Sequence, residues 1–331
     1  MTRLRTLHAV TSHSTTVCAI APGGIGNLGP GLDVLGCAVE GLHDRVWATR
    51  LDEPGVCIDE PGHPDLPRDP ELHTSAIAAT EVLRRAGAES VGVALTIDKG
   101  LPIAGGQGGS AASAVAGAVA TNALIGHPLP EYQLIEAALV AEAAVSGRQA
   151  DNIAPILLGG IILVRSIDPL DLVRLPVPDA LRIVLVHPEY QLNTTDARRA
   201  LPARIDRQTA LHQAAQVAAI VAALAAGDLE LLGRAIDDRI AEPARAPLLP
   251  GFAETKYAAM AAGALGCSIS GAGPSAFALV ESEPVGQAVA VAMCDAYEAL
   301  GIKATARVTV VDRVGARLVP NSDASPMLRL L

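Results

Sequence analysis

The sequence predicts an α+β fold in two lobes, because strand-like and helix-like segments are mixed along its 331 residues without strict βαβα alternation. Half of the residues are hydrophobic and only 2% are aromatic, so the chain can bury a large core built from Ala, Val, Leu and Ile. We place the boundary between the lobes near Leu158–Val164, which gives an N-terminal domain over 10–160 and a C-terminal domain over 161–320.

The first half contains a strand, a glycine-rich loop and two helices in succession. Apolar residues alternate in VGVALTID (91–98), as they do in a half-buried strand. LPIAGGQGGSAAS (101–113) follows at once, and the small residues after it predict a helix. A second helix is predicted over 130–147, with Pro130 near its start and Gly147 near its end.

The second half begins with a predicted strand over 181–188. An Ala-rich stretch predicts a long helix over 209–227, and a further helix is predicted over 228–242. Residues 267–280 are typical of a strand, a tight glycine turn and a second strand. Another helix and a strand over 303–312 complete this half.

Composition excludes several classes of function. The net charge of −10 argues against binding to nucleic acid or to an anionic membrane, both of which favour a basic surface. The five cysteines are scattered without a C-x-x-C pair, and the histidines show no H-x-x-x-H spacing, so a structural zinc site is not expected. There is no apolar signal-peptide core, and no apolar stretch is long enough to span a bilayer. We therefore expect a soluble, reduced, cytoplasmic protein.

The glycine-rich loop is the strongest chemical signal. Glycines before a helix let the free N–H groups of its N-terminus approach an anion such as phosphate. Ser110 stands at the start of that helix, where it could contact phosphate or Mg²⁺, or simply cap a flexible turn. A Walker A loop requires a lysine before this serine, and there is none. Residues 106–111 also fit G-x-G-x-x-A, but the second strand of a Rossmann unit is missing after them, which makes a dinucleotide-binding dehydrogenase the weaker alternative.

Three stretches in order carry a resemblance to the GHMP kinases. The loop over 101–113 is similar to their P-x-x-x-G-L-G-S-S-A-A motif, and SISGAGPSAFAL (268–279) also agrees with the family. APGGIGNLGPGLDVLG (21–36) resembles the N-L-G-P-G-F-D signature of the branch that acts on L-homoserine. Further agreement with that branch lies in QADNIAPILLGG (149–160), NTTDARRALP (193–202) and AEPARAPLLPG (241–251).

The resemblance implies a kinase with an N-terminal ATP-binding lobe and a C-terminal ferredoxin-like lobe. It would move the γ-phosphoryl group of ATP, with Mg²⁺, to the side-chain hydroxyl of L-homoserine, mainly by positioning and charge neutralisation. The family also suggests a homodimer. Residues implied to hold the nucleotide are Pro102, Gly105, Gly106, Gln107, Gly108, Gly109, Ser110 and Ala111.

The same resemblance implies roles for residues outside the loop. Ser110 and Glu142 match the residues that contact Mg²⁺, and together with Asn27 they form the implied catalytic set. The implied substrate-binding residues are Asn27, Asp33, Asn152, Arg198 and Arg245, of which the two arginines would hold the carboxylate of the amino acid.

The residues themselves leave alternatives open. Glu142 falls on an apolar face of the 130–147 helix, where a carboxylate is costly unless it is paired or bound to a metal, although a helix edge that reaches solvent would also explain it. Asn27 and Asp33 could merely shape a turn, and Arg198 could be solvated. We expect Lys99, beside the loop, to lie at the surface rather than on phosphate.

The chain departs from the family at three places. Gln107 replaces the leucine, and Gly109 the first serine, of G-L-G-S-S. PGGIGN replaces the usual P-A-S-x-A-N of the family. LHTS, after Glu71, replaces an Asn-Leu pair that helps to hold the nucleotide in the family. These departures keep two alternatives open: a GHMP kinase for another small alcohol, and a catalytically weak GHMP-like binding protein.

Overall fold

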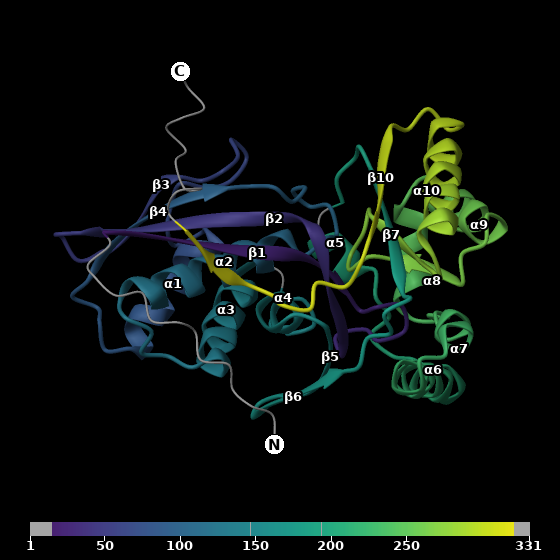
Figure 1. Ribbon diagram of the computed structural model, residues 1–331, viewed down its shortest axis with the longest axis horizontal. Coiled ribbons are helices and arrows are strands. Elements are labelled where there is room, and N and C mark those ends of the chain that lie inside the picture. The colour runs from purple at the N-terminus through teal and green to yellow at the C-terminus, as the bar shows by residue number, and fades with distance from the viewer. Residues whose placement is uncertain (1–14, 146, 193, 321–331) are drawn as a thin grey trace.

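Two β-sheets, one for each lobe, organise the protein. The computed structural model describes residues 15–145, 147–192 and 194–320 (Figure 1). The first sheet has the strand order β11-β1-β2-β4-β3, with β5 paired to β2 and β6 to β5. Its strands are β1 (Thr16–Gly26), β2 (Leu35–Leu51), β3 (Gly55–Glu60), β4 (Gly92–Asp98), β5 (Ile161–Ile167), β6 (Leu170–Leu175) and β11 (Arg317–Val319).

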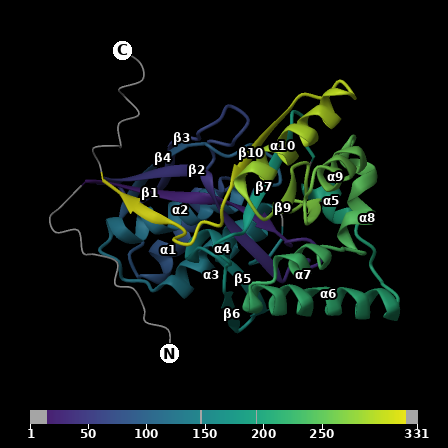
Figure 2. The ribbon, with the colours of Figure 1, turned by 45° about the vertical axis from the view of Figure 1, so that its right-hand side comes forward.

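Four helices cover one face of this sheet (Figures 1 and 2). Every residue of the second one from Ala111 to Asn122 is buried, which explains its small side chains, because a helix enclosed on all sides is apolar all round and packs closely. The core of this lobe is accordingly rich in alanine. The helices are α1 (Thr74–Arg85), α2 (Gly109–Leu124), α3 (Glu131–Val145) and α4 (Ile153–Leu158).

The second lobe is built on a four-stranded antiparallel sheet with the order β10-β7-β9-β8. Its strands are β7 (Arg182–Pro188), β8 (Gly266–Ile269), β9 (Ala276–Val280) and β10 (Ala304–Thr309). Helices separate β7 from β8 and β9 from β10, which is the β-α-β-β-α-β sequence of a ferredoxin-like unit. The helices are α5 (Thr194–Arg199), α6 (Arg207–Ala226), α7 (Leu229–Arg234), α8 (Ala241–Arg245), the 3₁₀ turn η1 (Ala246–Leu248), α9 (Phe252–Ala261) and α10 (Glu283–Glu298). The predicted two-lobed α+β fold is confirmed.

The single helix predicted over 228–242 is wrong, because the chain forms α7 and α8 there with a break between them. The buried carboxylate of Asp238 causes the break: it accepts hydrogen bonds from the backbone N–H groups of Ile240, Ala241 and Glu242. It also accepts one from the side chain of Gln213 on α6. A carboxylate that caps a new helix cannot lie in the interior of a continuous one.

The division of the chain at residue 160 stays a prediction. In the structure, β5 and β6 follow that residue but pair within the first sheet, and β11 returns to pair with β1. Val39 on β2 also bridges to Val311 after β10. The part of the chain that belongs to the first sheet therefore includes residues from both predicted ranges.

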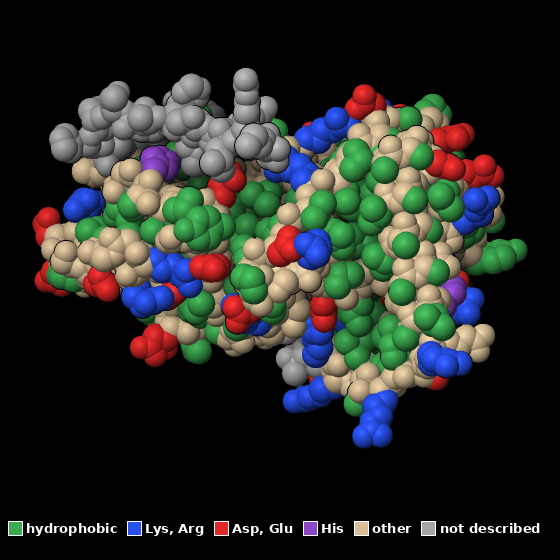
Figure 3. All heavy atoms as spheres, turned by 90° about the horizontal axis from the view of Figure 1, so that it is seen from below, with side chains coloured by type: hydrophobic (Ala, Val, Ile, Leu, Met, Phe, Trp, Pro, Cys, Tyr) green, Lys and Arg blue, Asp and Glu red, His purple; other side chains and the backbone are tan. Residues whose placement is uncertain are grey.

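Helix α6 is the one helix of the described residues with the length and hydropathy of a membrane span, and 22% of its most apolar window is buried. Its inner residues Ile220, Ala223 and Leu224 pack into the core of the second lobe. Its outer face is uncharged between Arg207 and Asp228, and Figure 3 shows this side of the molecule with a strip of green and tan atoms on the right. The absence of membrane binding stays a prediction.

Lys99 is buried, so the expectation of a surface lysine is wrong. Its ammonium group forms an ion pair with Asp44 on β2, and the side chains of the two residues are 6% and 0% exposed. It also donates to the carbonyl oxygen of Gly109 and to the hydroxyl of Ser113, each at 3.0 Å. Asp44 in turn accepts from the Ser113 hydroxyl and from the backbone N–H of Leu101. This network fixes the first turn of α2 to the sheet.

Replacing Lys99 with Met is expected to lower the free energy of unfolding by about 3–5 kcal/mol, because it leaves the buried carboxylate of Asp44 without its cation. Urea denaturation measures the change. The matched control is Lys303→Met at an exposed lysine, which should change stability by less than about 0.5 kcal/mol. Equal effects of the two substitutions would contradict a structural role of the buried pair.

Candidate active site

The glycine-rich loop joins β4 to α2 and lies against the second lobe. Gly106 and Gly108 have φ of 73° and 71°, a left-handed backbone that favours glycine. A Cβ on Gly106 would lie 2.5 Å from the carbonyl oxygen of Ser270 and 2.6 Å from that of Gly273. The backbone therefore approaches the turn between β8 and β9, and the loop needs glycine for that approach.

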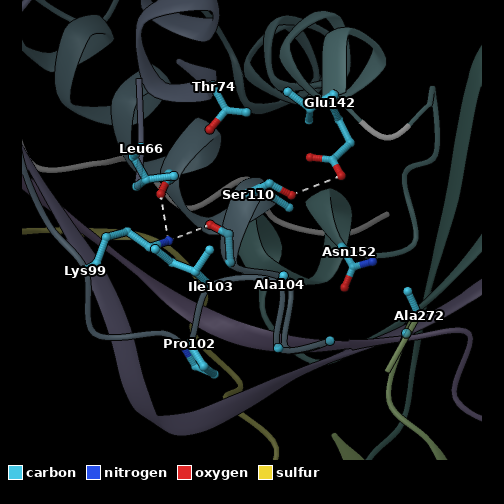
Figure 4. A pocket seen from close by; sticks show the side chains of 18 of the residues that line it. Leu66, Thr74, Lys99, Pro102, Ile103, Ala104, Ser110, Glu142, Asn152 and Ala272 are labelled. Atoms are coloured by element: carbon cyan, nitrogen blue, oxygen red, sulfur yellow. Dashed lines mark hydrogen bonds between the residues drawn. The ribbon is translucent and has the colours of Figure 1, made fainter. Parts of the chain in front are cut away.

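A pocket of about 610 Å³ opens over this loop. Figure 4 shows Ser110 and Glu142 facing each other, with Leu66 and Lys99 on one side and Asn152 and Ala272 on the other. The predicted nucleotide residues that line it are Pro102, Gly105, Gly106, Gly108, Gly109, Ser110 and Ala111. Gln107 is not among the lining residues, because its side chain is 1% exposed and points into the lobe interface.

Ser110 and Glu142 meet in the pocket from two different helices. The hydroxyl of Ser110, in the first turn of α2, donates to the carboxylate of Glu142 on α3 at 3.1 Å. Glu142 is 8% exposed, so it is a buried carboxylate rather than a solvated helix edge. The free N–H groups and positive dipole end of α2 lie beside this pair, so two oxygen-bearing side chains adjoin a region of positive potential.

The turn between β1 and β2 holds Asn27 and Asp33 in left-handed backbone conformations, with φ of 69° and 60°. The side-chain oxygen of Asn27 accepts from the backbone N–H of Asp33, and its amide nitrogen donates to the carbonyl oxygen of Gly271. Asn27 thus shapes the turn and also ties it to the second lobe. The backbone N–H of Asn27 donates to Asp151 at 3.0 Å.

Arg198 and Arg245 approach this turn from α5 and α8. Arg198 donates to both carboxylate oxygens of Asp33, at 3.0 and 3.2 Å. Arg245 is 4% exposed and donates only to backbone carbonyls, those of Gly271 and Ala197, in the part of the chain that the structure describes. Burial and the charge of Arg198 lower the pKa of Arg245. A buried guanidinium without a carboxylate partner is costly, so this corner favours an anionic ligand.

The structure brings the predicted residues into two groups. Ser110 and Glu142 lie in the pocket over the loop, whereas Asn27, Asp33, Arg198 and Arg245 are joined by hydrogen bonds to one another or to Gly271 in the turn between β8 and β9. Asn152 lines the pocket, and Gly271 borders it while accepting from Asn27 and Arg245. The two groups are therefore neighbours with a shared border.

Asp151 is a candidate that the sequence analysis missed. Burial raises its pKa to about 7, and the charges of Asp33 and Glu142 add to the effect. Its charge thus interacts with one member of each group. The only signal in the sequence was its place beside Asn152 in QADN, which does not reveal that the side chain is buried between them.

The LHTS departure falls on one side of the pocket, where Leu66, Leu72, His73 and Thr74 line it. His73 is buried, and its Nδ1 accepts from the backbone N–H of Ser75 as the N-cap of α1. Burial lowers the pKa of His73, so the ring is neutral near pH 7 and serves as a cap. The surface on this side is apolar, with Leu72 largely exposed.

The fold and these contacts define a two-lobed α+β protein with a phosphate-type glycine loop. Residues 73–160 match the model of the GHMP kinases N terminal domain, and residues 220–299 match that of the GHMP kinases C terminal domain. The chain belongs to the GHMP kinase family. Kinases of this family use ATP as a substrate.

Relatives agree over nearly the whole chain. It is 45% identical to homoserine kinase of Arabidopsis thaliana over 313 residues, covering 92% of this chain and 85% of that protein. It is 39% identical to homoserine kinase of Chlorobium phaeobacteroides, covering 92% and 99%. The crystal structure of homoserine kinase from Cytophaga hutchinsonii superposes with a TM-score of 0.90 at 40% identity, covering 94% and 99%. The L. major mevalonate kinase, at 19% identity and a TM-score of 0.68, shares the fold.

The raised pKa of Asp151 predicts a pH-dependent stability. The folded carboxyl has a pKa of about 7 against an ordinary 3.8. Between these values the folded chain holds a proton that the unfolded chain releases, so Asp151 lowers the free energy of unfolding as pH rises, and the cost is complete above pH 7. Asp151→Asn should therefore gain stability relative to the wild type by about 1 kcal/mol per pH unit from pH 5 to 7. Urea denaturation across this range tests it; a difference that does not vary with pH would be contrary to the raised pKa.

Proposed function

We propose that the protein transfers the γ-phosphoryl group of ATP to the side-chain hydroxyl of L-homoserine and forms O-phospho-L-homoserine. The observation that carries the proposal is the corner formed by Arg245, Arg198 and Asp33 beside the phosphate-type pocket. The names of the relatives that match over nearly the whole chain support the same reaction.

The charges of this corner fit the zwitterion of an α-amino acid. Arg245 has no carboxylate partner among the described residues, and Arg198 is paired with Asp33 alone. The carboxylate of the amino acid would lie between the guanidinium groups of Arg198 and Arg245. The ammonium group of the same amino acid would face Asp33. Charge-assisted hydrogen bonds of this kind hold the backbone of the amino acid, while the side-chain hydroxyl extends toward Asn152 and Asn27 at the border of the pocket.

The nucleotide would lie over the loop, with its phosphates on the N-terminus of α2. Residues 105 and 106 and 108–111 line the pocket there, and their N–H groups provide the positive potential that a triphosphate requires. The carboxylate of Glu142 and the hydroxyl of Ser110 would hold Mg²⁺. They fit it, because Mg²⁺ takes oxygen ligands, one or two carboxylates and the substrate phosphates. When bound, it would neutralise charge on the phosphates.

Catalysis then rests on alignment of the hydroxyl with the γ-phosphoryl group. The protein contributes fixed donors and fixed charges from both lobes. Burial raises the pKa of Asp151 to about 7, which makes this carboxyl, bonded to the backbone N–H of Asn27, the candidate acceptor for the hydroxyl proton.

The proposal includes a cytoplasmic homodimer. All five cysteines are free thiols, and three of them are buried, which is compatible with a reducing compartment. Support for the dimer comes from the outer face of α6, where Leu211 is 65% exposed and the helix carries no Lys, Arg, Asp or Glu after Arg207. Sedimentation equilibrium would measure the assembly.

A coupled assay that follows ADP release, run with L-homoserine and with a panel of other amino-acid and isoprenoid alcohols, tests the reaction. L-Homoserine should give the highest kcat/KM. Arg245→Met should raise the KM for homoserine about ten- to a hundredfold through the loss of one charge-assisted contact, and leave the KM for ATP unchanged. The matched control is the exposed Arg204→Met. A higher kcat/KM for another alcohol would refute L-homoserine as the substrate. Equal rises in the KM for homoserine and the KM for ATP in Arg245→Met would refute the role of Arg245 in holding the carboxylate.

Replacing Glu142 with Gln tests the metal site, because the change keeps the shape and removes the charge. The Mg²⁺ concentration needed for half-maximal rate should rise, and kcat should fall by about 10²–10³, the order of one lost transition-state contact. The exposed Glu230→Gln on α7 is the control. If the Mg²⁺ dependence of the Glu142 variant matches the wild type, Glu142 does not bind the metal.

A further inference from the structure

Gln107 connects the glycine loop to the second lobe. Its side-chain nitrogen donates to the hydroxyl of Ser275 at 3.0 Å, and its side-chain oxygen accepts from Arg307 on β10 at 2.7 Å. These partners are 168 and 200 residues away in the sequence. Gln107 is the one residue with a long side chain between Gly105 and Ser110, and that side chain is 1% exposed and turned away from the pocket.

The chain of hydrogen bonds continues to His187 on β7. Nδ1 of His187 lies 3.1 Å from the hydroxyl oxygen of Ser275. Burial and the charge of Arg307 lower the pKa of His187, which favours the neutral form of the ring. The donors therefore run in one direction through Gln107: Arg307 donates to its side-chain oxygen, and its side-chain nitrogen donates to the hydroxyl of Ser275, which lies next to His187. Each hydroxyl and amide atom in the chain has one consistent role.

Arg307 depends on Gln107 for a hydrogen bond. Among the described residues it has no carboxylate within ion-pair distance, and its Nε has no hydrogen-bond partner. Burial lowers the pKa of this arginine to about 10, which reflects the cost of a desolvated cation. The side-chain oxygen of Gln107 is the acceptor that the structure gives it. The loop and β10 thus stabilise each other.

The backbone of the loop is held from the same side. Ser270 donates through its hydroxyl to the carbonyl oxygen of Gly106 at 2.7 Å, and the backbone N–H of Ser275 donates to that of Gly105. The four glycines around Gln107 lose much conformational entropy when the loop is ordered. A buried side chain that is fixed at both polar atoms offsets part of this loss, and it does so without occupying the pocket.

We propose that Gln107 is a positioning residue that links the nucleotide affinity of the glycine loop to Arg307 in the second lobe. Arg307 lies outside the pocket and would act on the nucleotide only through Gln107. The inference rests on the proposed binding of ATP over the loop, but not on the identity of the alcohol.

The test is the dissociation constant of a non-hydrolysable ATP analogue, measured by calorimetry on the full chain. Gln107→Leu and Arg307→Met should each weaken binding about tenfold. The double variant should be no weaker than either single variant, because both break the same link. Ser275→Ala is a milder variant at a fully buried serine, and it should weaken binding about threefold. Matched controls are Gln287→Leu and Arg204→Met on the surface, which should bind like the wild type.

The KM for homoserine separates this role from a general loss of structure. It should be unchanged in all four variants at a temperature well below their melting points, because in the described chain the side-chain hydrogen bonds of Gln107 go to Ser275 and Arg307 and not to the amino-acid corner. Three outcomes would overturn the proposal. The single variants could bind the analogue as tightly as the wild type, the losses of affinity could add up in the double variant, or the KM for homoserine could rise in parallel with the dissociation constant. If the wild type binds the analogue but does not phosphorylate homoserine, only the proposed function fails; if the wild type does not bind the analogue, both fail.

Discussion

The close contact between the glycine loop and the turn at residues 270–275 is the constraint on which the site depends. Gly106 packs against the carbonyl oxygens of that turn at a distance that no Cβ would allow, and Gly271 donates through its N–H to the carbonyl oxygen of Gly26. One short turn of the second lobe therefore touches both the phosphate loop and the end of β1. The relative position of the two groups of site residues follows from this contact, since each group is built on a segment that the turn holds.

Buried charge is distributed unevenly around this contact. Lys99 and Asp44 neutralise each other below α2, so the loop is anchored by a pair that needs no ligand. Arg245 is buried and Arg307 partly buried, both without a carboxylate partner in the described chain, and each is held by neutral oxygen atoms. The two arginines differ in what they face: Arg245 adjoins Arg198 and Asp33 in the amino-acid corner, whereas Arg307 faces the side chain of Gln107. The charge of a ligand can compensate the charge of Arg245, whereas only the protein can compensate the charge of Arg307.

The sequence predicted well what short segments determine. The alternation in 91–98 predicted a strand, and the glycines before Ser110 predicted a loop and a helix start. Glu142 on an apolar helix face left two alternatives, a paired or metal-bound carboxylate and a solvated helix edge. The rest depends on contacts between distant segments. Lys99 was expected at the surface from its place beside the loop; its partner Asp44 lies 55 residues away, and no local pattern shows that pairing. Asp151 was missed for the same reason, because its pKa is set by burial and by charges on other elements.

The departure at Gln107 shows how a local difference becomes intelligible only in three dimensions. In the sequence it is a polar residue where the family has leucine, and the resemblance implied a nucleotide contact. In the structure its side chain lies outside the pocket and bonds to Ser275 and Arg307, so leucine at this position would leave a partly buried cation and a buried hydroxyl short of a partner. A chain with Gln107 therefore also requires polar groups at 275 and 307. The loop motif and the second-lobe sheet have to be considered as one polar unit, which the order of motifs along the chain does not reveal.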